Sequence, residues 1–203
     1  MDAEAQNHCT AFKGARRIAS GELAEVAVKA KAAVDKGEQV LIFDDTTSES
    51  IELDFRGSSE DVLRRLPHPD GGEATAISGA ARGPGRPKLG VVAREVTLLP
   101  RHWEWLNAQP GGASVALRKL VEEARRANEG KDRVRRSQEA AYRFMSVMAG
   151  NRPGFEEATR ALFAGHRERF ERLVEPWPRD VRNHARKLAA AALDADAQAQ
   201  TRS

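Results

Sequence analysis

The feature that most constrains the fold is a stretch between residues 93 and 126, where a short extended segment is followed directly by two helical segments. Residues 91–99 are rich in aliphatic and β-branched side chains, as is typical of a strand, and Pro100 stands where a helix would begin. The following ten residues predict a helix, a Gly-Gly pair predicts a turn, and Ser114 is expected to cap a second helix.

Apolar residues recur at helical spacing in both predicted helices. Trp103 and Leu106 lie three residues apart in the first, and the second has a stripe at i, i+3, i+4 and i+7, formed by Leu117, Leu120, Val121 and Ala124. Over residues 91–127 this succession resembles the ribbon-helix-helix unit of small bacterial DNA-binding proteins. The resemblance implies a homodimer, in which the 91–99 strands of two chains pair into a ribbon that lies in the major groove of DNA.

The resemblance implies two kinds of DNA contact. Arg94 and Thr97 would touch the DNA from the ribbon. Ser114, Arg118 and Lys119 would hold a phosphate, because free N–H groups and the helix dipole at a helix N-terminus favour an anion.

The register of the ribbon strand has two alternatives. In one, Glu95 and Thr97 face the DNA while the valines face the core. In the other, Arg94 faces the DNA together with Val96 and Leu98. The sequence leaves both open.

A basic arm precedes the strand. Gly85-Arg86-Pro87-Lys88 resembles the centre of an AT-hook, although Pro84 stands where the first arginine of that motif belongs. Proline keeps such an arm extended, and arginine is attracted to the narrow minor groove. Arg86 and Lys88 are therefore predicted minor-groove contacts.

The first 66 residues predict a small domain with an antiparallel sheet. Its expected elements are a hairpin over 9–19 with Gly14 at the turn, a helix over 23–36 capped by Ser20, paired strands over 39–43 and 50–55, and a short helix over 58–66.

The remainder of the chain is predicted to be helical. Residues 67–90 are expected to form a Gly/Pro-rich basic linker and arm, residues 128–193 a helical region after a break at 128–131, and residues 194–203 a disordered tail. The predicted fold class is α+β, rich in helix: a small sheet domain over 1–66, the strand-helix-helix unit over 91–127, and a C-terminal helical bundle.

Catalytic and metal-binding patterns are weak. Asp44 and Asp45 follow a predicted strand, as nucleophilic carboxylates can, but Thr46 occupies the position that an Asp-x-Asp pattern requires. The five histidines are scattered, and a lone Cys9 is more typical of a small buried apolar residue than of a nucleophile. We therefore expect no cofactor, no metal and no enzymatic activity.

Charge and hydropathy indicate the kind of partner and the cellular compartment to expect. Residues 1–66 carry 9 basic and 13 acidic side chains, whereas residues 67–203 carry 24 and 17, which favours a polyanionic partner for the later part. No segment has the pattern of a signal peptide or of a membrane helix, and one cysteine fits a reducing compartment. These features predict a cytoplasmic protein.

A second resemblance covers nearly the full chain apart from the tail. It is carried by the runs AFKGARRIASGELAEVA, GRPKLGVVAREVTLLPRHWEWL, GGASVALRKLVEEARR and PGFEEATRALFAGHRERFERL. Together they resemble a bacterial family known only as a domain of unknown function. That resemblance implies a bacterial cytoplasmic protein and transfers no binding or catalytic residues.

The leading hypothesis from the sequence is a homodimeric DNA-binding protein that regulates transcription and pairs through its 91–99 strand. The alternative is a protein-interaction module without a nucleic-acid role, in which the tryptophan-containing helix packs within one monomer. A third interpretation is a hydrolase that uses the Asp44–Asp45 loop.

Overall fold

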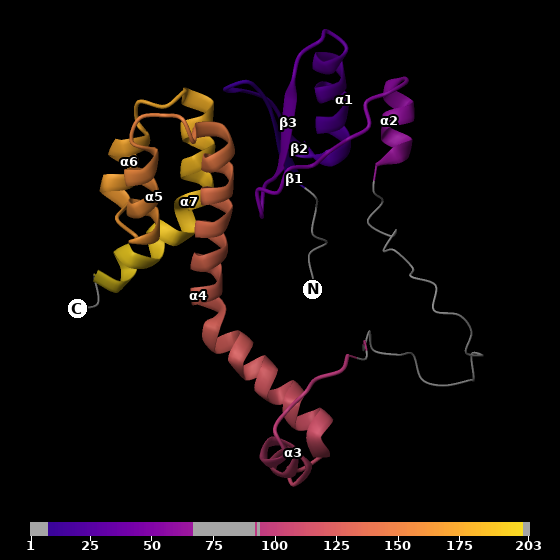
Figure 1. Cartoon of the computed structure of the whole chain (residues 1–203), viewed down its shortest axis with the longest axis vertical. Helices are drawn as coiled ribbons and strands as arrows, with labels where there is room; N and C mark the ends of the chain where they lie inside the picture. The colour runs from indigo at the N-terminus through magenta and orange to yellow at the C-terminus, as the bar shows by residue number, and fades with distance from the viewer. Residues whose placement is uncertain (1–7, 67–91, 93, 201–203) are drawn as a thin grey trace. The chain divides into compact units, whose positions relative to one another are not determined.

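The computed structural model describes residues 8–66, 92 and 94–200. The chain divides into two compact units: residues 1–66 together with 129–203 form the first, and residues 67–128 form the second (Figure 1). The sequence did not indicate that the first and last parts of the chain combine into one unit.

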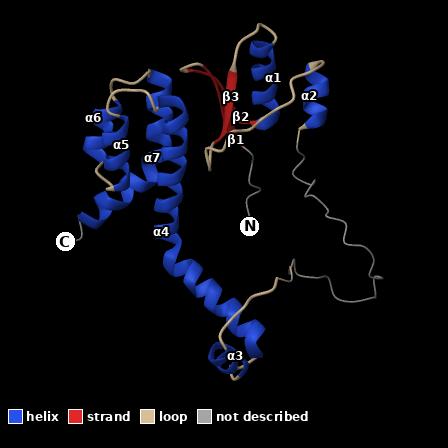
Figure 2. Cartoon of the chain, in the orientation of Figure 1, coloured by secondary structure: helices blue, strands red, loops and turns tan. Residues whose placement is uncertain are grey.

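The first unit contains a three-stranded antiparallel sheet in the order β2-β1-β3 (Figure 2). Its strands are β1 (His8–Lys13), β2 (Arg16–Glu22) and β3 (Val40–Asp44). Gly14 adopts a φ of +52° in the tight turn between β1 and β2, a conformation that glycine accommodates without strain. The predicted hairpin with Gly14 at its turn is therefore confirmed.

Two short helices accompany the sheet: α1 (Leu23–Val34) and α2 (Ser59–Arg65). The prediction that Ser20 caps α1 is wrong, because β2 continues to Glu22 and Glu22 itself holds the N-cap position. The predicted cap of α2 is present. Ser58 accepts a hydrogen bond from the Asp61 N–H while the Asp61 side chain accepts one from the Ser58 N–H.

Alternate side chains of the sheet enter two different cores, since neighbouring residues of a strand point to opposite faces. Cys9, Ala11 and Ile42 pack with α1 in one cluster. Phe12 and Phe43 pack with the C-terminal helices in the other. The sheet is thus the middle of three layers, with α1 on one face and the C-terminal helices on the other.

Residues 51–56 do not form the predicted second strand of a β3 hairpin. Pairing with β3 is limited to one bridge between Phe43 and Ser50, with hydrogen bonds from the Ile51 N–H to the Ile42 carbonyl and from the Asp44 N–H to the Glu49 carbonyl. The predicted apolar face nevertheless exists, because Ile51, Leu53 and Phe55 pack against the α1 cluster. The alternation therefore indicated burial, which side chains can achieve without a continuous ladder.

The described part of the C-terminal half contains four helices: α4 (Gly112–Ala149), α5 (Phe155–Phe163), α6 (Arg167–Val174) and α7 (Arg179–Gln200). Between α6 and α7, Trp177 is buried and its indole N–H donates to the Pro153 carbonyl at 3.1 Å, which fixes the connection between these two helices. The predicted disordered tail is wrong for residues 194–200, because α7 continues to Gln200.

The second unit contains α3 (Pro100–Asn107) and the beginning of α4. The predicted break at 128–131 is wrong: α4 is a single helix of 38 residues that passes through Gly130. A glycine inside a helix costs about 1 kcal/mol, too little to end a helix that is supported on both sides. The fold class, α+β and rich in helix, is as predicted.

The shared core predicts cooperative unfolding. Phe144 of α4 is fully buried against Phe12 and Phe43 of the sheet. Phe144→Ala should lower the free energy of unfolding by about 3–5 kcal/mol, measured by urea denaturation. Val147→Ala, at an exposed position of the same helix, should change it by about 0.5 kcal/mol or less. A sheet and a helical region that unfolded in separate transitions would contradict the shared core.

Candidate nucleic-acid interface

The second unit has almost no core of its own. Among its described residues, 92 and 94–128, only Leu106 of α3 and Ala116 of α4 are buried. Helical stability in proteins comes mainly from packing of an apolar face rather than from helix propensity. The α3 helix and the part of α4 up to residue 128, which bury one leucine and one alanine, therefore lack most of the packing that would stabilise them.

The missing packing corresponds to exposed apolar side chains on the same segment. Eight of the large hydrophobic residues that are exposed lie between residues 92 and 121: Val92, Val96, Leu99, Trp103, Trp105, Val115, Leu120 and Val121. Clusters of this kind on a protein surface mark interaction sites. We call this set the apolar face of the second unit.

The segment before α3 has no regular secondary structure in the single chain. Val92 and residues 94–99 form no strand, and residues 92 and 94–98 make no backbone hydrogen bond to another described residue. A ribbon strand would pair with the same strand of a second chain. The predicted ribbon therefore stays a prediction.

An open groove runs between this segment and the first turns of α4. Val92 and Val96 line it from one side, and Leu117 and Val121 from the other. Its cationic lining residues include Arg94, Arg118 and Lys119. The fold thus brings together three of the predicted DNA contacts.

The other predicted contacts have different positions. Ser114 does not cap α4, because the helix begins two residues earlier at Gly112; its hydroxyl instead accepts a hydrogen bond from Arg118 at 2.9 Å. Thr97 is exposed and does not line the groove. Arg86 and Lys88 lie outside the described residues.

The cations of the groove differ in their partners. Glu122 accepts hydrogen bonds from Arg125 and Arg126, and the bond from Arg125 is the main reason that the pKa of Glu122 lies below its usual value. Arg94 and Lys119 form no ion pair with any described residue. These two cations are available for an anionic partner.

The carboxylates considered for catalysis have structural partners. Asp44 accepts hydrogen bonds from the N–H groups of Thr46 and Thr47 and so closes the turn after β3. Asp45 accepts from Thr10 at 2.5 Å and from Lys187 at 2.6 Å. Burial raises the pKa of Asp45, but the bonds from Lys187 and Thr10 outweigh burial and leave it below its usual value.

Other candidate ligands and nucleophiles also lie within the fold. Within the described ranges, no group of three or more His, Cys, Asp or Glu residues could hold a metal ion. Cys9 is fully buried; burial, followed by the charges of Asp45 and Asp44, raises the pKa of its thiol to about 11. A thiol with that pKa is not a thiolate at neutral pH.

Comparison with known proteins assigns the chain to a family. Residues 8–189 match a family described as an uncharacterised protein conserved in bacteria (DUF2239), and the chain belongs to that family. No curated protein and no solved structure matches the chain. Across the described residues, none of the helices has the length and apolar character needed to cross a membrane.

The sequence analysis did not identify a buried histidine on α7 that packs against Phe12 of the sheet. His184 is 2% exposed, its ring lies 4.5 Å from that of Phe144, and neither ring nitrogen has a hydrogen-bond partner among the described residues. Burial lowers its pKa to about 4; Lys187 and Arg17 act in the same direction, and Asp45 opposes them. Its helical spacing alone did not distinguish it from an exposed histidine.

This histidine predicts a dependence of stability on pH. The native state keeps His184 neutral down to pH about 4, whereas the unfolded chain protonates it near 6.5. The unfolded state therefore binds more protons between these values, and the free energy of unfolding should fall by up to about 3 kcal/mol as pH drops from 6.5 to 4. His184→Leu should remove this part of the slope in urea titrations. His166→Leu, at an exposed position, should retain it; equal slopes in both variants would contradict the assignment.

Proposed function

We propose that this protein is a homodimeric DNA-binding protein, and that it acts in regulating transcription. The observation that carries the proposal is the groove at the start of α4, where exposed apolar side chains lie beside Arg94 and Lys119, two cations that form no ion pair with any described residue. Exposed apolar surface of this kind favours association with a partner. The cations beside it favour an anionic ligand for the resulting assembly.

A second copy of the chain is the partner that fits best. The backbone groups of residues 92 and 94–98 have no hydrogen-bond partner among the described residues, and two identical segments would satisfy such groups reciprocally by pairing antiparallel. The apolar face then supplies both halves of a shared core, because Trp103, Leu120 and Val121 from each chain would cover one another. A two-fold dimer uses the same surface on both chains and closes without further growth.

Duplication of the chain also doubles the positive charge. Arg94 and Lys119 of each copy would lie on the same side of the paired segments, where each can contact a phosphate oxygen. The first turn of α4, which has no acidic residue, adds the positive end of a helix dipole. The rival interpretation, a module that binds an unrelated protein, rests on the same apolar face and is separated from this one by the mass of the particle in solution.

The dimer predicts a matched difference between two valine substitutions. Val121→Glu places a charge in the apolar face, so sedimentation equilibrium should show a monomer for this variant and a dimer for the wild type. Val147→Glu introduces the same charge at an equally exposed position of α4 in the first unit and should remain a dimer. A wild-type protein that sediments as a monomer at micromolar concentration would rule out the ribbon.

The DNA contacts predict a change in salt dependence. The double variant Arg94→Ala/Lys119→Ala should flatten the slope of log affinity against log salt concentration on duplex DNA by about 3 to 4, because two copies lose two phosphate contacts each at about 0.9 per contact. Fluorescence anisotropy measures this slope.

Its control is Lys36→Ala/Arg152→Ala, which removes the same charges from exposed positions in the first unit. That variant should keep the wild-type slope. If both double variants flattened the slope equally, binding would be a response to net charge and not to this groove.

A further inference from the structure

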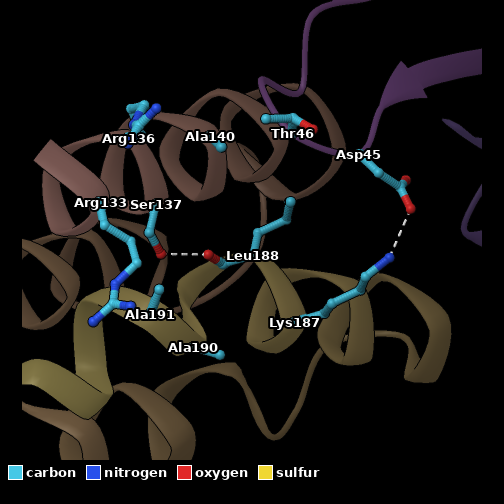
Figure 3. Close-up of a pocket in the computed structure, with 10 residues that line it drawn as sticks. All are labelled: Asp45, Thr46, Arg133, Arg136, Ser137, Ala140, Lys187, Leu188, Ala190 and Ala191. Carbon is cyan, nitrogen blue, oxygen red and sulfur yellow. Dashed lines mark hydrogen bonds and ion pairs between the residues drawn. The ribbon is translucent and has the colours of Figure 1, made fainter. Parts of the chain in front are cut away.

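The first unit contains a second, unrelated cavity. It has a volume of about 370 Å³ and opens between α4, α7 and the turn after β3 (Figure 3). Its lining comes from three segments far apart in the sequence: Asp45, Thr46, Arg133, Arg136, Ser137, Ala140, Lys187, Leu188, Ala190 and Ala191.

The charges on this lining are predominantly positive. Arg133 and Arg136 lie one turn apart on α4, and Lys187 approaches from α7 (Figure 3). Asp45 is the carboxylate on the lining, and it is already bound by Lys187 and by Thr10. The two guanidinium groups therefore have no carboxylate of the cavity left to pair with.

The arginines of α4 that line the cavity differ from a neighbouring arginine in their side-chain partners. Arg135, which does not line the cavity, pairs with Asp132 at 3.0 Å, as exposed helical arginines commonly do. Arg136 donates only to the Asp132 backbone carbonyl, at 3.2 Å. The side chain of Arg133 makes no hydrogen bond or ion pair with any residue in the described part of the chain.

The floor of the cavity is apolar because small side chains leave space there. It is formed by Ala140 of α4 and by Leu188, Ala190 and Ala191 of α7. The hydroxyl of Ser137, which also lines the cavity, is occupied by hydrogen bonds within the protein. It donates to the Leu188 carbonyl at 2.5 Å and accepts from the Ala192 N–H at 3.1 Å. A ligand on this floor meets carbon atoms and no competing hydrogen-bond donor from Ser137.

We propose that this cavity binds a small organic anion with a compact apolar body, whose carboxylate or phosphate group is held by Arg133 and Arg136. Guanidinium groups match the geometry of both anions through paired N–H donors. The apolar body rests on the alanine floor, and Lys187 stands between the anion and Asp45. The volume suits a molecule of metabolite size, within the range of small-molecule pockets. The site is independent of the proposed DNA contacts, which lie in the second unit.

A nucleic-acid backbone fits this cavity less well than a small molecule does. Phosphate contacts of DNA-binding proteins lie on surfaces that follow the duplex, and they do not need an apolar floor. The alanines and Leu188 are useful only to a ligand that enters the cavity. Binding of DNA by Arg133 and Arg136 is therefore the alternative that the experiment must distinguish from binding of a small anion.

The test is a titration of ¹⁵N-labelled full-length protein, in which amide shifts of residues 133–140 and 187–191 are followed. The probes are phenyl phosphate, benzoate and inorganic phosphate. Phenyl phosphate or benzoate should produce saturable shifts, and the stronger of the two identifies the preferred head group. Inorganic phosphate should bind about tenfold or more weakly than phenyl phosphate, because it lacks the apolar body.

Two variants locate the site. Arg133→Ala/Arg136→Ala should weaken the better aromatic probe by about tenfold or more, as expected for lost charge-assisted hydrogen bonds. Ala190→Leu should also weaken it, by filling the cavity while leaving the cations in place. Arg152→Ala/Arg169→Ala, at exposed positions outside the lining, should bind as the wild type does.

Three results would overturn the proposal. The first is the absence of saturable shifts with both aromatic probes at millimolar concentration. The second is unchanged probe affinity in Arg133→Ala/Arg136→Ala. The third is a loss of DNA affinity in that variant with probe binding intact, which would assign the two arginines to a nucleic-acid surface. None of these results bears on whether Arg94 and Lys119 bind DNA.

Discussion

The packing of Phe144 against the sheet is the interaction on which the first unit depends. Its ring lies 5.4 Å from that of Phe12 and 5.3 Å from that of Phe43, which joins the helix of the chain's second half to strands of its first. Burial of such aromatic rings supplies a large part of core stability. Because this contact joins segments about a hundred residues apart, the sheet and the C-terminal helices form one core, and neither has a complete core alone.

The two units divide stability and recognition between them. The first buries its large apolar residues in two clusters on opposite faces of the sheet. Beside one of them, against Phe12 and Phe144, it buries His184, whose ring nitrogens have no hydrogen-bond partner among the described residues. In the second, the described residues bury one leucine and one alanine and leave Trp103 and Trp105 36% and 53% exposed. A segment that cannot complete its own core is suited to binding, since association with a partner supplies the burial that folding of the single chain does not.

Sequence patterns predicted the local elements well where the signal lies within one turn or one hairpin. Gly14 marked the β1–β2 turn, Ser58 with Asp61 marked the start of α2, and Pro100 marked the start of α3. They failed where a neighbouring element decides the outcome. Ser20 resembles a helix cap but is held in β2 by pairing with Thr10, and residues 51–55 alternate as a strand does but pack through side chains without a ladder. Propensity is a weak guide at such positions because tertiary contacts outweigh it. In the groove, Arg94, Arg118 and Lys119 had been named from the ribbon-helix-helix resemblance and stay predicted DNA contacts, whereas the hydrogen bond between Ser114 and Arg118 was not expected.

The sequence by itself determined the class of the fold, the β1–β2 turn, the starts of α2 and α3 and the basic character of the later part of the chain, because these follow from short-range periodicity and charge. Only the tertiary structure decided which distant residues meet. Asp45 binds Lys187, and Arg133 shares a cavity with Ala190, although no spacing in the sequence links either pair. Such contacts depend on how the helices pack on the sheet. That packing is set by the combined shape of many side chains, which no local pattern in the chain contains.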